Sequence, residues 1–446
     1  MSDFLSQLFH TTKIKEFVPL FKEAIEKYES PEAFLGEVAA YLPIRLYERY
    51  YDDSVPNSFF GLISASQLIQ STGPENGRWK PLAQQSWFAT KERKRPALDP
   101  GSAPAKQEGD LEARWKHFQE ASDAGNFPEA LSWTKGFLSN DEERTFFQQK
   151  SLEYALDDNF QGGHKFLYLS QTWRLAEALQ WNHTEEILCP ALHFLVVAPQ
   201  DRALSRRVRE FSSQSLSSLL SNEGSLSSAH YFEAEKTLLF SDELQDALST
   251  LVTLSNQGAG LDAVYEVVLT ATGQALSNSR AGDWIWPMRA FHLSYSLQQW
   301  SGLDAKKKTY AVAMAAALLH QASQRSRELD HNRQVDELAK ELCPVDPLRM
   351  LRTVVSHSDP YASAAAVIAA LGMDEAKKEE LFQALSSLAV KNDGNNCYGH
   401  DILFVHEVKD CYQRFQLKEK GKLPVAAGFF LGRATKSYEL FGTYKD

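Results

Sequence analysis

Five of the twelve histidines in this chain lie in strongly apolar segments. They are His164 in GGHKFLYLSQTW, His292 in WIWPMRAFHLSYSLQQW, His320 in YAVAMAAALLHQASQ, and His400 and His406 in HDILFVH. A helix that is apolar on all sides is buried, and a buried imidazole must be hydrogen-bonded or bound to something that offsets its desolvation. Imidazole is a common metal ligand, and helical bundles build metal sites from inward-facing side chains. The pattern predicts either a metal centre or a set of ordinary buried histidines.

Spacing reduces these five histidines to four candidate ligands. His400 and His406 are six residues apart, which places them about 240° apart around one helix. We therefore do not expect both to bind one ion, and His400, nearer the preceding turn, is the better candidate. HExxH and paired ExxH motifs are absent, which argues against a ferritin-like di-iron site. The predicted metal ligands are His164, His292, His320 and His400, with Asp401 as a partner that orients His400.

His164 follows the glycine pair Gly162–Gly163. Glycine has no Cβ, so the chain can turn sharply there and a helix can begin at His164. The positive end of that helix lowers the pKa of a nearby imidazole and favours the neutral form that a metal requires. We expect His164 to point away from solvent, as a ligand or as a residue that lines the site, with core packing as the alternative.

Four aromatic residues near these histidines could line an apolar pocket for a hydrophobic small molecule. They are Tyr168, Trp286, Tyr295 and Trp300. Plain core packing explains the same residues and remains the alternative.

The elements that carry these residues are predicted to be helices throughout. Apolar residues recur at spacings of three and four, and alternating strand patterns are nearly absent, so the predicted fold class is all-α with packed helical hairpins. Residues 1–70 form a predicted N-terminal helical unit, and residues 111–446 the main all-α domain. Prolines and glycines between them predict a flexible linker over residues 71–110. The AGNFPEAL turn predicts one hairpin that resembles a tetratricopeptide unit, without a repeat array.

Composition excludes several classes of protein. Apolar residues make up 43% of the chain and charged residues 24%, as in a globular protein. No apolar run is long enough for a membrane span, and the N-terminus lacks signal-peptide features, so we expect a cytoplasmic protein. The net charge of −11, with only short basic clusters, argues against nucleic acid as a partner. The four scattered cysteines contain no CxxC pair, which indicates buried thiols. P-loop, dinucleotide-binding and nucleophile-elbow motifs are absent.

The order of several motifs resembles the questin oxidase-like family, a mostly helical group whose fungal members act on anthraquinone polyketides. The motifs are the Gly-His pair at 163–164 with its apolar helix, ALHFLVVAPQDR at 191–202, the helix with Trp286 and His292, and the stretch from His400 to His406. The resemblance covers roughly residues 111–440. It implies an oxidoreductase that uses dioxygen on a hydrophobic, aromatic small molecule, with histidine-bound iron as its cofactor.

A second interpretation is a non-catalytic α-helical interaction or scaffold protein, which the hairpins and the acidic charge also fit. Iron in the purified protein would favour the enzyme interpretation. Absence of iron after iron-supplemented expression would favour the scaffold interpretation. The oligomeric state is left open by the sequence, with a homo-oligomer among the alternatives.

Overall fold

The computed structural model describes residues 2–45, 57–69, 75–91, 103–216, 222–280, 283–300, 302–326, 331–342, 346–391 and 400–434. Within these ranges the regular structure is helical, and the nearest approach to a strand is isolated bridging, as between Gly224 and Ala259. The predicted all-α fold class is confirmed. None of the described helices combines the length and the apolar character that a bilayer crossing requires.

The chain divides into two compact units. Among the described residues, the first unit contains those up to Asp201 and those from Val390 to Leu403, and the second contains those from Arg202 to Ala389 and from Phe404 to Ala434. Helix α22 (His400–Arg414) begins in the first unit and continues in the second. Both sides of the predicted boundary at residue 111 belong to the first unit.

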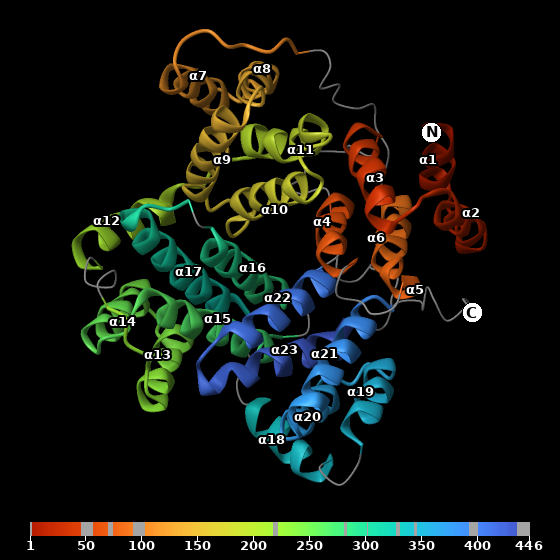
Figure 1. The fold of residues 1–446 in the computed structure, drawn as a ribbon. Helices are drawn as coiled ribbons and strands as arrows, with labels where there is room; N and C mark the ends of the chain where they lie inside the picture. Colours follow the sequence, from red (N-terminus) through yellow and green to blue (C-terminus); the bar gives the residue numbers. More distant parts are fainter. Residues whose placement is uncertain are drawn as a thin grey trace. The chain divides into compact units, whose positions relative to one another are not determined.

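The first unit is built from helices that follow one another along the chain (Figure 1). They are α1 (Ser2–His10), α2 (Ile14–Lys27), α3 (Pro31–Arg45), α4 (Asn57–Ile69), α5 (Glu75–Arg78), α6 (Lys80–Lys91), α7 (Leu111–Asp123), α8 (Phe127–Phe137), α9 (Asp141–Leu156), α10 (His164–Ala178) and α11 (Thr184–Val197). Helices α3 and α4 pack against α11 and α10, respectively. The N-terminal helices thus share a core with the helices that the sequence assigned to a separate domain.

Most of the predicted linker that the structure describes is helix. Residues 75–91 form α5 and α6, and α6 packs against α4. Trp87 is buried, and its ring centroid lies 5.2 Å from that of Phe17 in α2. Proline was the misleading signal, because Pro81 occupies the first turn of α6, where a missing N–H costs no helical hydrogen bond. Helices α5 and α6 thus stand where a flexible linker is predicted, and residues 71–74 and 92–102 of that predicted linker lie outside the described residues.

The AGNFPEAL hairpin forms as predicted from α7 and α8. Gly125 takes a φ of 67° in the turn, a left-handed conformation that glycine tolerates. The side chain of Asn126 then accepts a hydrogen bond from the backbone N–H of Glu129 and caps α8.

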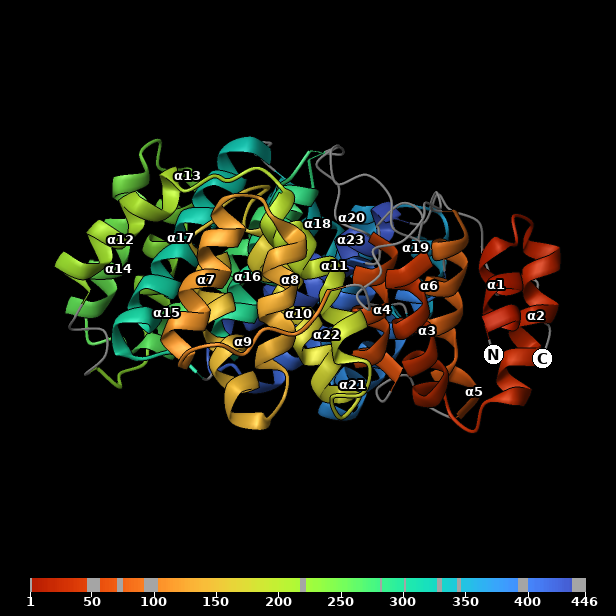
Figure 2. The same ribbon diagram turned by 90° about the horizontal axis from the view of Figure 1, so that it is seen from above.

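The second unit holds the remaining helices. They are α12 (Ala203–Ser215), α13 (Ser228–Phe240), α14 (Leu244–Asn256), α15 (Leu261–Ser277), α16 (Ile285–Gln299), α17 (Ala305–Ser326), α18 (His331–Leu342), α19 (Pro347–Ser356), α20 (Pro360–Leu371), α21 (Glu375–Ala389), most of α22, the 3-10 helix η4 (Lys418–Gly421) and α23 (Lys422–Ala434). Helices α15, α16 and α17 pack against one another (Figure 2). The apolar run of α17 is buried from Ala311 to Leu319, as its composition predicts.

Two glycines bring α23 close to α20 in this unit. A Cβ atom on Gly428 would lie 2.6 Å from Cγ2 of Val367, and one on Gly432 would lie 2.7 Å from the carbonyl oxygen of Asp359. Both distances are too short for a real contact. The sequence AAGFFLG therefore gives α23 a face without side chains, on which α20 rests.

Candidate functional site

His292 and Glu407 form a buried pair in the second unit. The side chains of both residues have no exposed surface, and Nδ1 of His292 lies 2.6 Å from Oε2 of Glu407. His292 comes from α16 and Glu407 from α22. The ring of Phe404 stands edge-on to the imidazole, with centroids 6.3 Å apart. An imidazole and a carboxyl group thus meet inside an aromatic core.

The pair belongs to a short ladder of polar contacts between the same two helices. Tyr295 follows His292 by three residues, and Asp410 follows Glu407 by three, so each couple lies on one helix face. The hydroxyl group of Tyr295 donates to Oδ2 of Asp410 at 3.0 Å. Asp410 also accepts from Arg414 at 2.8 Å. The ladder runs from the fully buried histidine toward the exposed Arg414.

Burial fixes the charge of His292. It lowers the pKa of the imidazole from 6.5 to about 3, so the ring is neutral at physiological pH. With a carboxylate as the acceptor, Nδ1 carries the proton and Nε2 keeps its lone pair. This is the arrangement by which a carboxylate sets the tautomer and orientation of a histidine that acts as a base.

The other three predicted ligands are also buried. His164 begins α10, and its Nδ1 lies 2.9 Å from the carbonyl oxygen of Gln161. His320 lies in α17, with Nε2 3.0 Å from the carbonyl oxygen of Ser241. His400 is 3% exposed at the start of α22, whereas His406 is half-buried. His164 and His400 belong to the first unit, and His292 and His320 to the second.

The described residues contain no group of three or more His, Cys, Asp or Glu side chains that could hold a metal ion. Each unit contributes only two of the four candidate histidines. His320 and His164 already have a backbone carbonyl as a partner. Asp401, the expected partner of His400, is fully buried, and its Oδ1 lies 2.9 Å from the backbone N–H of Ile402.

The turn before His164 has the predicted conformation. Gly162 and Gly163 take φ values of 73° and 83°, and α10 begins at the next residue. Gln161, whose carbonyl contacts the imidazole, is also left-handed, with a φ of 51°. His164 therefore points inward, as expected, and contacts the turn that precedes it.

Beside this turn lies a buried ion pair that the sequence analysis missed. Nζ of Lys165 is 2.6 Å from Oδ2 of Asp158 and 3.0 Å from the carbonyl oxygen of Ala198, and the lysine side chain has no exposed surface. Oδ1 of Asp158 accepts hydrogen bonds from the backbone N–H groups of Phe160 and Asp201. These contacts tie the turn to the end of α11.

Of the four predicted pocket aromatics, Tyr168 belongs to the first unit and the other three belong to the second. Tyr168 is buried in the first unit, where its ring stands edge-on to that of Phe194. Trp286 and Tyr295 are nine residues apart on α16, which places them about 180° apart around the helix. The guanidinium of Arg325 covers the Trp286 ring at 4.1 Å. Trp300 is half-buried just beyond the end of α16.

Cys189 and Cys411 are buried, as expected, while Cys343 and Cys397 lie outside the described residues. Burial raises the pKa of the Cys411 thiol well above its usual value. This thiol is therefore protonated and unreactive.

Comparisons with protein-family models, with curated protein sequences and with solved structures find no match to this chain.

Proposed function

We propose that this chain is an oxidoreductase that acts on a hydrophobic, aromatic small molecule, with His292 as its general base. The observation that carries the proposal is the 2.6 Å contact between His292 and Glu407 in a fully buried setting. The resemblance to questin oxidase-like proteins supplies the reaction class, and His292 is one of the residues on which that resemblance rests.

Burial of an imidazole and a carboxyl group costs free energy, so core packing alone does not explain this pair. Desolvation of an imidazole and a carboxyl group usually cancels the gain from their contact, and apolar residues of similar volume often pack at least as well. Functional sites, in contrast, use burial and a charged neighbour to set the protonation state of a base. A neutral imidazole with its tautomer fixed by a carboxylate presents the Nε2 lone pair that this role needs. In the proposal, the pKa of His292 must rise from about 3 toward the working pH when the substrate binds, because an efficient general base has a pKa near that pH.

The chemistry assigned to the pair is proton removal. Nε2 of His292 would take a proton from a hydroxyl group or an acidic carbon of the substrate, and Glu407 would stabilise the imidazolium that forms. Loss of the proton makes an aromatic substrate richer in electrons, and the resemblance implies dioxygen as the acceptor of those electrons. Because His292 has no exposed surface, the proposal requires a movement that opens the contact between α16 and α22 to the substrate.

Iron bound by His164, His292, His320 and His400 remains a prediction from the sequence. A cytoplasmic location and assembly into a homo-oligomer are likewise predictions from the sequence.

The experiment is a screen for dioxygen consumption with a panel of hydroxylated aromatic compounds, combined with metal analysis of the same preparation. Consumption that depends on His292 supports the proposal, with or without bound iron. About one equivalent of iron would support the predicted metal centre. A protein that consumes no dioxygen with any compound and holds no iron after iron-supplemented expression would favour the scaffold interpretation.

A further inference from the structure

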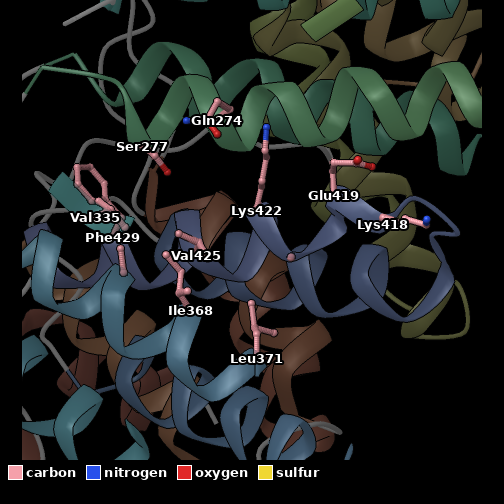
Figure 3. A pocket seen from close by; sticks show the side chains of 12 residues that line it. Gln274, Ser277, Val335, Ile368, Leu371, Lys418, Glu419, Lys422, Val425 and Phe429 are labelled. Atoms are coloured by element: carbon pink, nitrogen blue, oxygen red, sulfur yellow. The ribbon is translucent and has the colours of Figure 1, made fainter. Parts of the chain in front are cut away.

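A cavity of about 480 Å³ lies in the second unit, between α15 on one side and α18, α20 and α23 on the other (Figure 3). The segment η4 lies at one end of it. The apolar lining residues are Val335, Ala364, Ile368, Leu371, Val425 and Phe429. The polar, charged or glycine lining residues are Gln274, Ser277, Lys418, Glu419, Gly421 and Lys422. Sites for small molecules commonly have volumes of roughly 300–1,000 Å³ and combine apolar lining residues with a smaller number of polar groups.

We propose that this cavity binds an uncharged small molecule with an aliphatic body and a hydroxyl head group. It does not contain His292 or Glu407, so the inference is independent of the proposed function.

The apolar side of the cavity would hold the body of the ligand. Val335, Ala364 and Phe429 form a buried cluster, against which Ile368 and Val425 pack while remaining half-buried. Ile368 lies on α20 and Val425 on α23, and both side chains line the hollow in Figure 3. Their exposed apolar surface is what an aliphatic chain would cover. The close contact of α20 with Gly428 holds the two helices together beneath this surface.

The polar side of the cavity carries charges that cancel. Nζ of Lys422 lies 2.6 and 2.7 Å from the two carboxylate oxygens of Glu235. Lys418 and Glu419 are adjacent in η4, and Lys418 makes no ion pair with the residues that the structure describes. Two ammonium groups and two carboxylates sum to zero, so neither sign of charge on a ligand is favoured.

A hydroxyl group suits the polar side of the cavity because it donates one hydrogen bond and accepts others. The carboxylate of Glu419 is an acceptor, and the ammonium groups of Lys418 and Lys422 are donors. A charged head group would lose its hydration shell without meeting a net opposite charge. The inferred ligand class is therefore an aliphatic alcohol or a related uncharged amphipathic molecule.

The experiment compares three probes with the same body and different heads: 1-octanol, octanoate and octylammonium. In the assay, each probe competes with Nile red for the full chain, and the fluorescence of the dye reports its displacement. We expect octanol to displace the dye at a concentration at least about tenfold below that of either charged probe, because desolvation of a charged head group costs far more than desolvation of a hydroxyl group. Tighter binding of octanoate or octylammonium, or no displacement by octanol, would overturn the inference.

A matched pair of variants locates the site. Ile368→Trp fills the cavity, whereas Met373→Trp makes a similar change at an exposed residue just beyond α20. Octanol affinity should fall at least about tenfold in Ile368→Trp and stay within about twofold of wild type in Met373→Trp. Circular dichroism tests whether both variants are folded. If Ile368→Trp does not fold, Leu371→Phe serves as a second variant that fills the cavity. Equal octanol binding by the filled variant and Met373→Trp would place the ligand elsewhere and refute the inference.

Discussion

Nδ1 of His292 lies 2.6 Å from Oε2 of Glu407, and this contact joins two helices across 115 residues of sequence. Both side chains are fully buried. The neutral imidazole keeps a lone pair on Nε2 only if the proton stays on Nδ1. The protonation state of His292 is therefore the feature on which the proposed role as a base depends.

The first prediction concerns the titration of His292. Because its folded pKa is lowered to about 3 from 6.5, the unfolded chain takes up this proton first as the pH falls. The stability that neutral His292 contributes is fully present above pH 6.5 and is lost as the pH falls toward 3, by up to about 1.4 kcal/mol per pH unit. In ¹⁵N spectra, the Nδ1–H tautomer should persist at pH 5.

His292→Asn is the matched variant for this prediction. Between pH 6.5 and pH 4, its free energy of unfolding should fall less steeply than that of wild type. His193 has a similarly lowered pKa through burial, so part of the slope should remain. A wild-type His292 resonance that titrates near pH 6.5 would show that the pair is not closed in solution.

The second prediction concerns the Lys165–Asp158 pair of the first unit. Lys165→Met removes the cation and leaves a buried carboxylate with only its backbone donors. The free energy of unfolding should fall by about 3–5 kcal/mol, because an uncompensated buried charge is expensive. Denaturant unfolding measures this loss, and Lys150→Met, at the more exposed pair with Glu112, should change stability by less than about 1 kcal/mol. Equal effects of the two variants would mean that Asp158 finds another partner or takes up a proton at little cost.

The third prediction separates a packed helix from a linker in residues 75–91. Trp87→Ala should lower the free energy of unfolding by about 3–5 kcal/mol, because the indole is buried against Phe17. Lys80→Ala, at an exposed residue at the start of the same helix, should have little effect. Thermal or denaturant unfolding of both variants checks the difference. If Trp87→Ala is as stable as wild type, α6 does not contribute to the core.

Much of the helical fold could be predicted from the sequence, because apolar spacing reports local periodicity. The helix predicted to begin at His164 corresponds to α10, His164–Ala178, and the predicted helix with Trp286 and His292 corresponds to α16, Ile285–Gln299. Helix α6 was missed because Pro81 and the buried polar residues Gln84 and Gln85 hide its periodicity. Pairing across the fold is not a local property, so the division into units could not be read from composition.

The candidate site was predictable only in part. His292 was identified because an imidazole in an apolar helix needs a partner, but Glu407 was not, since nothing local links residues so far apart. The matching spacing of His292 with Tyr295 and of Glu407 with Asp410 was the available signal. Convergence of four histidines is a tertiary property that spacing cannot establish.

The most direct test of the central claim is the turnover rate of Glu407→Gln, measured by dioxygen consumption with the best compound from the screen. Asp410→Asn is its control, because it makes the same chemical change one helical turn away, at the partner of Tyr295. Loss of the carboxylate that orients a general base should lower kcat by about 10²- to 10⁴-fold in Glu407→Gln, while Asp410→Asn should stay within a few-fold of wild type. Equal rates in the two variants, or no dioxygen consumption by the wild-type protein with any compound, would contradict the account.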